Sequence, residues 1–319
     1  MLEIGAVLKV IAEIAGATGL VEVSHRAHEW LKGRAQTHKE VDAAKQLLGI
    51  ARDDVAYRHD SVHPLYSGAT ELHPDNLAAL TAAAGDEYFR ACRLGHVRTA
   101  EALTSSLNTN LVLIGSPTAE GLSRPTFGYE PDIDPDSLAL GQPPIDLPLR
   151  WVLSKTQIDR RAQARRYVEG KAVVTRPNWR IEGQNKMFVP EVDSVGLLSL
   201  DYLLVTRLRN YLSHEALDKG KFILSFGGTH GTATRAIEIL LRDRETLRKI
   251  AHQLEGPPAA YQFLLKVGAM NHDMSRGTRA TRVELAGDPI IIPDNQQTWL
   301  YAAKVAKSNL EKWLKAETK

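Results

Sequence analysis

Residues 221–242 read KFILSFGGTHGTATRAIEILLR, and this stretch decides the predicted fold class. Its first residues form an apolar run that is typical of a buried strand, and its last residues have the spacing of an amphipathic helix. A tight turn of glycine and threonine joins the two. Such a unit presents unpaired backbone N–H groups to an anion at the start of the helix. The stretch therefore predicts an α/β fold with a nucleotide-like ligand.

Two further apolar runs, LVLIG at 111–115 and YLLVTRL at 202–208, predict strands of the same sheet. Short continuous apolar strands are typical of parallel sheets that are covered on both faces. We therefore expect residues 108–319 to form a Rossmann-like, mostly parallel sheet flanked by helices. A loop-rich insertion is expected at about 125–195, because its first part is dense in proline and aspartate. A closing helix is expected at about 295–317, with one buried face.

Residues 1–107 contain no run that predicts a strand. Helical periodicity recurs in VDAAKQLLGIARDDV and in PDNLAALTAAAGDEYFRACRL. We expect a helical module that mediates self-association or partner contact, and therefore a homo-oligomer. The apolar first 21 residues carry Glu3 near their start, where a signal peptide has basic residues, and they contain Lys9 and Glu13. These charges favour a packing helix over a signal peptide or a membrane span.

The composition is that of an ordinary soluble globular protein, with 43% hydrophobic residues, 24% charged residues and a net charge of +2. This balance does not favour a nucleic-acid partner or a membrane. The single cysteine, Cys92, excludes an intrachain disulfide framework and fits a reducing cytoplasm. The eleven histidines show no metal-binding spacing, so no metal is expected.

The candidate ligand-binding residues lie at predicted strand ends. The glycines of the turn allow close backbone approach, the threonine hydroxyls could donate hydrogen bonds, and Arg235 could pair with a phosphate oxygen. His230 is the group of the turn that titrates near neutral pH. The full candidate set is Gly115, Ser116, Thr118, Arg207, Gly227, Gly228, Thr229, His230, Gly231, Thr232 and Arg235.

One candidate segment has a second interpretation, and the catalytic candidates apply only if the protein is an enzyme. The segment 115–118 could be a helix N-terminus with Pro117 at the first helical position, and this is compatible with a ligand contact. Asp273 follows the next predicted strand and, with His230, is a candidate acid or base if the protein is an enzyme. Asp201 is assigned to the opposite edge of the sheet as a structural residue, whereas Arg207 near the strand end could reach the ligand.

The turn GGTHGT resembles the glycine loop of the SLOG and LOG group of Rossmann-like proteins, whose pattern is Pro-Gly-Gly-x-Gly-Thr-x-x-Glu and whose members bind or process nucleotides. Phe226 stands in place of the proline, and Arg235 occupies the place of the family's catalytic glutamate. This exchange favours holding an anion over cleaving a bond. The matching residues are Gly227, Gly228, Gly231 and Thr232, with one extra residue between the glycines.

A looser likeness covers residues 108–290 and joins LVLIGSP, DYLLVTRLRN and FGGTHGT. These blocks are similar to uncharacterised bacterial Rossmann-like domains, frequent in actinobacteria, that tend to be linked with signalling or conflict systems. The resemblance implies nucleotide sensing.

The leading hypothesis is that the protein binds or senses a nucleotide or nucleotide-derived ligand in bacterial signalling or defence. One alternative is a hydrolase that cleaves an N-glycosidic or phosphate bond in such a ligand, or in NAD. A second alternative is a structural assembly protein in which the turn needs glycine for geometry alone. The identity of the ligand or cofactor stays open.

Overall fold

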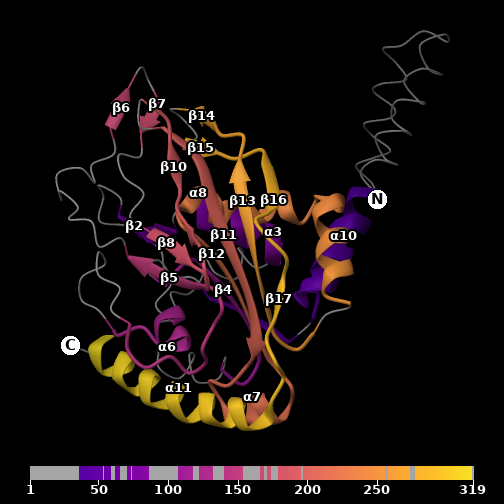
Figure 1. Ribbon diagram of the computed structural model, residues 1–319, viewed down its shortest axis with the longest axis vertical. Helices are drawn as coiled ribbons and strands as arrows, with labels where there is room; N and C mark the ends of the chain where they lie inside the picture. Colours follow the sequence, from indigo (N-terminus) through magenta and orange to yellow (C-terminus); the bar gives the residue numbers. More distant parts are fainter. Residues whose placement is uncertain are drawn as a thin grey trace, which may run out of the picture.

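The structure is a computed structural model that describes residues 36–52, 54–58, 62–64, 70–72, 74–85, 107–117, 122–131, 140–153, 166–168, 171–173, 179–194, 197–255, 258–273 and 277–317. An eight-stranded sheet forms its centre (Figure 1). The main path of neighbours runs β1 (Val55–Arg58), β4 (Asn110–Ile114), β12 (Phe222–Gly228), β11 (Leu198–Arg209), β13 (Tyr261–Gly268) and β16 (Arg282–Leu285). Two short strands pair off this path, β10 (Glu191–Val192) with β11 and β17 (Ile290–Ile291) with β13.

The central sheet is mixed. Strands β1, β4 and β12 pair in parallel. Strand β11 runs antiparallel to both of its neighbours, β12 and β13, and β16 is antiparallel to β13. The expectation of a mostly parallel sheet is therefore wrong, although the α/β character is confirmed. The connection from β11 to β12 holds only the short helix α7 (His214–Asp218), and it joins the two strands as an antiparallel pair.

Buried side chains cover both faces of the sheet. One face packs against the helix at residues 36–48 and against α3 (Pro74–Ala84), α8 (Gly231–Arg235), α9 (Ile237–Leu240) and α10 (Arg244–Gln253). The other face packs against α6 (Ser123–Phe127), α11 (Gln296–Glu317) and the small sheet of β5 (Arg150–Leu153), β8 (Trp179–Glu182) and β9 (Met187–Phe188). Along β4, Val112 and Ile114 face the first core, whereas Leu111 and Leu113 face the second. This explains why the run LVLI has no polar alternation.

Three two-stranded or edge elements complete the described chain. Strand β2 (Val62–Pro64) pairs with β3 (Thr70–Leu72), β6 (Arg166–Val168) with β7 (Lys171–Val173), and β14 (Asn271–Asp273) with β15 (Gly277–Arg279). In Figure 1 the β14–β15 hairpin and α8 lie near one end of the central sheet, and α7 and α11 lie at the other.

The first third of the chain does not lack strands. Strand β1 is part of the central sheet, and Leu48 and Leu80 pack in the same core as Val112. The described part of residues 1–107 therefore shares its core with the rest of the protein, and the apolar first 21 residues lie outside the described residues. A β-strand pattern of four residues is too short for periodicity to reveal.

The predicted closing helix is confirmed as α11. Trp299, Ala303, Ala306 and Trp313 are buried on its inner face. The described residues of the predicted insertion contain short strands, among them β7 (Lys171–Val173) and β9 (Met187–Phe188). No described helix combines the length and the apolar character needed to cross a membrane.

Candidate functional site

The candidate site lies where β12 ends and β11 begins. Because β11 is antiparallel to β12, Leu203 pairs with Gly228, and Asp201 lies beside the glycine turn. The sequence-based placement of Asp201 at the opposite edge is therefore wrong. The sequence carries no signal for this placement, because a strand that is buried on both faces has the same apolar pattern in either direction.

Asp201 is fully buried and organises the turn. Its Oδ1 atom accepts hydrogen bonds from the Tyr202 backbone N–H at 3.0 Å and from the Thr229 hydroxyl. His230 Nδ1 lies 3.1 Å from the same oxygen. Its other oxygen, Oδ2, is also buried, and no described residue donates a hydrogen bond to it. A buried carboxylate oxygen without a donor costs free energy, so this atom is an acceptor that a bound molecule could satisfy.

The glycines of the turn are required by close packing. A Cβ atom on Gly228 would lie 2.3 Å from the Thr234 backbone nitrogen and 2.4 Å from the His230 carbonyl oxygen. A Cβ atom on Gly227 would lie 2.8 Å from the Trp151 ring and 3.2 Å from Ser116 Cα. The glycines therefore let α8 and the Ser116 loop approach β12, which serves the geometry of the turn itself.

The threonine hydroxyls of the turn bind within the protein. Thr229 is bound to Asp201, Thr232 donates to the Thr278 carbonyl at 3.3 Å, and Thr234 accepts from the Gly228 N–H at 3.0 Å. The sequence predicted that these hydroxyls donate hydrogen bonds to a ligand. The fold instead uses them to fix the turn and to attach the β14–β15 hairpin to α8.

Arg235 is engaged with carboxylates. Its guanidinium lies 3.4 Å from Glu238 on the next helix and 3.7 Å from Asp75 on α3, and its side chain is 15% exposed. Because α3 packs against α8, it places an acidic group beside Arg235. The expected pairing of this arginine with a phosphate is therefore in competition with two ion pairs.

The start of α8 leaves donors open. His230 is the N-cap residue in an extended conformation, and its side chain makes no capping hydrogen bond. Within the described part of the chain, no acceptor bonds the backbone N–H groups of Gly231 and Thr232. The His230 side chain is 18% exposed, so its ring can be reached from outside while Nδ1 faces Asp201.

The β14–β15 hairpin is connected to the turn by hydrogen bonds. His272 Nδ1 lies 3.0 Å from the Thr278 hydroxyl, and the Thr278 carbonyl accepts from Thr232. Asp273, the candidate base from the sequence, is the neighbouring residue in β14 and pairs with Gly277 in the hairpin. The hydrogen bonds of the hairpin thus connect His272, through Thr278, to the glycine turn.

The remaining sequence candidates divide between the two edges of the sheet. Gly115, whose N–H donates to the Phe226 carbonyl, and Ser116 lie beside Gly227 as expected. Thr118 lies outside the described residues. Arg207 lies at the opposite edge, where it pairs in the sheet with Leu224 and Tyr261. It cannot contact the glycine turn, because β11 runs away from that edge.

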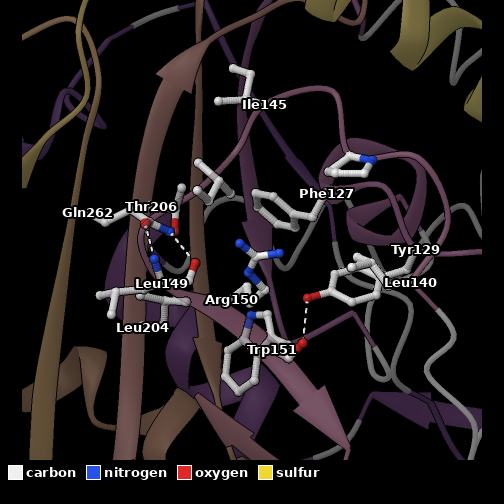
Figure 2. Close-up of a pocket in the computed structure, with 12 residues that line it drawn as sticks. Phe127, Tyr129, Leu140, Ile145, Leu149, Arg150, Trp151, Leu204, Thr206 and Gln262 are labelled. Atoms are coloured by element: carbon white, nitrogen blue, oxygen red, sulfur yellow. Dashed lines mark hydrogen bonds between the residues drawn. The ribbon is translucent and has the colours of Figure 1, made fainter. Parts of the chain in front are cut away.

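A separate, narrow apolar pocket with a cavity volume of about 20 Å³ lies on the second face of the sheet (Figure 2). Its wall includes Trp151, which also packs against Gly227. The polar groups around it are largely paired: Tyr129 donates to the Trp151 carbonyl at 2.8 Å, and the Gln262 amide bonds the Leu149 backbone at 2.9 Å in both directions. The pocket is therefore suited to apolar groups and has little capacity for polar recognition.

The comparisons with known proteins give no match: no protein-family model, no curated protein and no solved structure matches the chain. Among the described residues there is also no group of three or more histidine, cysteine, aspartate or glutamate side chains that could hold a metal ion.

Proposed function

We propose that the protein binds a nucleotide or nucleotide-derived ligand through a Rossmann-like glycine turn at the carboxyl ends of β4 and β12. The observation that carries the proposal is the buried Asp201 Oδ2 atom, which has no donor among the described residues. A ribose hydroxyl or a base amino group would supply the missing hydrogen bond. The open N–H groups of Gly231 and Thr232 are suited to an anionic oxygen of the same ligand.

The two kinds of group narrow the chemistry of the ligand. An anion alone would be repelled by the Asp201 carboxylate, and a neutral donor alone would leave the start of α8 unsatisfied. A nucleotide combines hydroxyl or amino donors, which can bind Asp201 Oδ2, with a phosphate group, which can accept from the N–H groups of Gly231 and Thr232. The resemblance to signalling and conflict-system domains suggests that binding serves sensing in bacterial signalling or defence.

Calorimetric and thermal-shift titration with mono-, di- and cyclic nucleotides and NAD tests the proposal. We expect one of these ligands to bind, and we expect Asp201→Asn to weaken its affinity about tenfold or more, because a charge-assisted hydrogen bond is lost. Asp218→Asn is the matched control, since Asp218 is exposed on α7 at the opposite end of the sheet. Equal affinity of Asp201→Asn and the wild type, or no binding across the panel, would contradict the proposal.

One contact supports hydrolysis as a second candidate function. His230 Nδ1 lies 3.1 Å from the buried Asp201 carboxylate, and a carboxylate in this position orients an imidazole so that Nε2 can act as a general base. Incubation with nucleotides and NAD, followed by chromatography, separates the two functions. Turnover that is lost in His230→Ala and retained in His252→Ala, an exposed histidine on α10, supports the hydrolase. Binding without product formation supports the sensor.

A further inference from the structure

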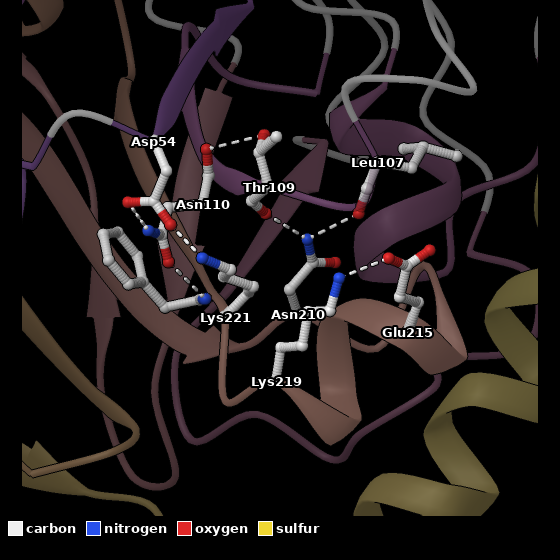
Figure 3. A network of polar contacts seen from close by, with 9 residues as sticks. Asp54, Leu107, Thr109, Asn110, Asn210, Glu215, Lys219 and Lys221 are labelled. Atoms are coloured by element: carbon white, nitrogen blue, oxygen red, sulfur yellow. Dashed lines mark hydrogen bonds and ion pairs between the residues drawn. The ribbon is translucent and has the colours of Figure 1, made fainter.

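A second polar region lies at the opposite edge of the sheet, where β1, β4 and β12 begin (Figure 3). The buried Asn110 side chain donates to Asp54 Oδ1 at 2.6 Å and accepts from the Phe222 N–H at 3.1 Å. Lys221 forms an ion pair with the other Asp54 oxygen. This network holds the side chains of Asp54, Asn110 and Lys221 in defined positions at the start of these strands.

An open hollow of about 550 Å³ lies next to this network. It is lined by Arg52, Asp54, Lys219, Gly220 and Lys221. Its size is in the range of small-molecule binding sites, and its lining is charged rather than apolar. The hollow is therefore suited to a small, strongly polar ligand.

Positive charge exceeds negative charge around the hollow. Lys221 is paired with Asp54, and Lys219 lies 2.5 Å from Glu215. Arg52 forms no ion pair with a described carboxylate, and it lies over the Phe222 ring with 6.0 Å between its Cζ and the ring centroid. One of the cations that line the hollow is thus left uncompensated by the described residues.

Arg207 does not line the hollow, but it brings a second guanidinium to the Phe222 ring. Its guanidinium lies 4.7 Å from the Phe222 ring centroid and donates to the Pro258 carbonyl at 2.9 Å, but it pairs with no described carboxylate. Its Nε atom and the hydroxyl of Tyr261, its cross-strand neighbour, are buried without a partner among the described residues. Burial lowers the pKa of Arg207, and the positive charges of Arg52 and Arg209 lower it further.

We propose that this hollow is an anion site that binds a phosphate group, either free or as part of a phosphorylated small molecule. The two guanidinium groups that no described carboxylate compensates match the charge of about −2 that a phosphate monoester carries. Arg52 and Lys219 contact the phosphate oxygens, and Arg207, which lies near the same Phe222 ring as Arg52, strengthens the positive potential. The site is separate from the glycine turn, because it lies at the other edge of the same sheet.

Calorimetric titration of the full chain at constant ionic strength tests this site with inorganic phosphate, glucose 6-phosphate and AMP. We expect binding in at least one arm, and we expect Arg52→Gln to weaken it about tenfold or more. Arg248→Gln, the matched control on the exposed side of α10, should bind as the wild type does. Because Arg52 is exposed, its exchange for glutamine should leave the fold intact, which a thermal melt verifies.

The arms also distinguish the source of the phosphate and the two proposed sites. Tighter binding of glucose 6-phosphate or AMP than of inorganic phosphate identifies a phosphorylated small molecule, and the reverse order identifies free phosphate. Binding that survives Asp201→Asn and is weakened by Arg52→Gln supports the hollow. No binding in any arm, or equal affinity of Arg52→Gln and the wild type, would overturn it whatever the outcome at the glycine turn.

Discussion

Gly228 shows that a glycine in a ligand-like turn can be required by the protein itself. Its N–H donates to the Thr234 hydroxyl, and its α-carbon faces the backbone of α8. A side chain would collide there, because the nearest atoms belong to the backbone of His230, Ala233 and Thr234 and cannot shift without moving α8. The same crowding makes a bulky residue at Gly228 a poor test of ligand binding, since it would disturb the turn before it blocked a ligand.

Gly228→Ala should lower the free energy of unfolding by about 1–3 kcal/mol, which is typical of overpacking a tight site. The added methyl would lie 2.3 Å from the Thr234 nitrogen. Urea denaturation followed by circular dichroism measures the change. Gly287→Ala is the control, because a methyl at this exposed glycine meets no atom within 4 Å. Equal stability of the two variants would show that α8 does not pack against β12 as described.

At the scale of elements, α11 is held at its start by Asp294. This carboxylate accepts from Arg209 Nε at 2.6 Å and Nη2 at 2.5 Å, and from the Trp299 ring N–H at 2.7 Å. Trp299 is 1% exposed and stacks on Tyr211, with 6.2 Å between the ring centroids. The aspartate thus connects β11 to the first turn of α11 and fixes how the helix lies on the second core.

Asp294→Asn should therefore destabilise the protein at neutral pH by about 1–2 kcal/mol, whereas Glu311→Gln on the exposed face of α11 should have no effect. The Arg209 hydrogen bonds hold the pKa of Asp294 below its usual value of 3.8. A depressed pKa means that the stabilisation is present above that usual value and is lost as the pH falls through the folded-state pKa. The difference between wild type and variant should shrink in that acidic range, and urea denaturation at a series of pH values measures it.

At the scale of the whole molecule, the two cores belong to one sheet that runs through the chain from β1 to β17. Strand β1 is hydrogen-bonded to β4, and α3 packs on α8 and α9. The described part of the first third therefore completes the first core.

A fragment of residues 108–319 should accordingly fail to fold. It lacks Leu48 and Leu80, each fully buried, and it would expose the side of the sheet that holds Val112 and Leu224. We expect no cooperative thermal transition by circular dichroism, in contrast to the full chain. A fragment that unfolds cooperatively would show that the boundary at 107/108 separates two independent domains.

The sequence predicts local features, such as long apolar strands, better than features that depend on contacts between distant segments. The runs LVLIG and YLLVTRL lie in strands β4 and β11, and the stretch at 221–242 begins as a strand and continues, after the turn, into helices. Prediction failed for β1, whose short sequence carries no periodic signal, and for the direction of β11. In the candidate site, Gly115, Ser116 and the glycine turn were brought together as predicted, whereas Arg207 was assigned to the wrong edge.

The sequence by itself determined the strands that contain 111–114 and 202–208, the closing helix, and the strand that meets a helix at a glycine turn. Those features follow from local hydrophobic patterns and from the close backbone approach that glycine permits. The tertiary structure decided the direction of β11, and with it the position of Asp201 beside His230 and of Arg207 over the Phe222 ring. A strand that is buried on both faces has the same sequence pattern in either direction, so only its pairing with β12 and β13 fixes which of its ends reaches the glycine turn.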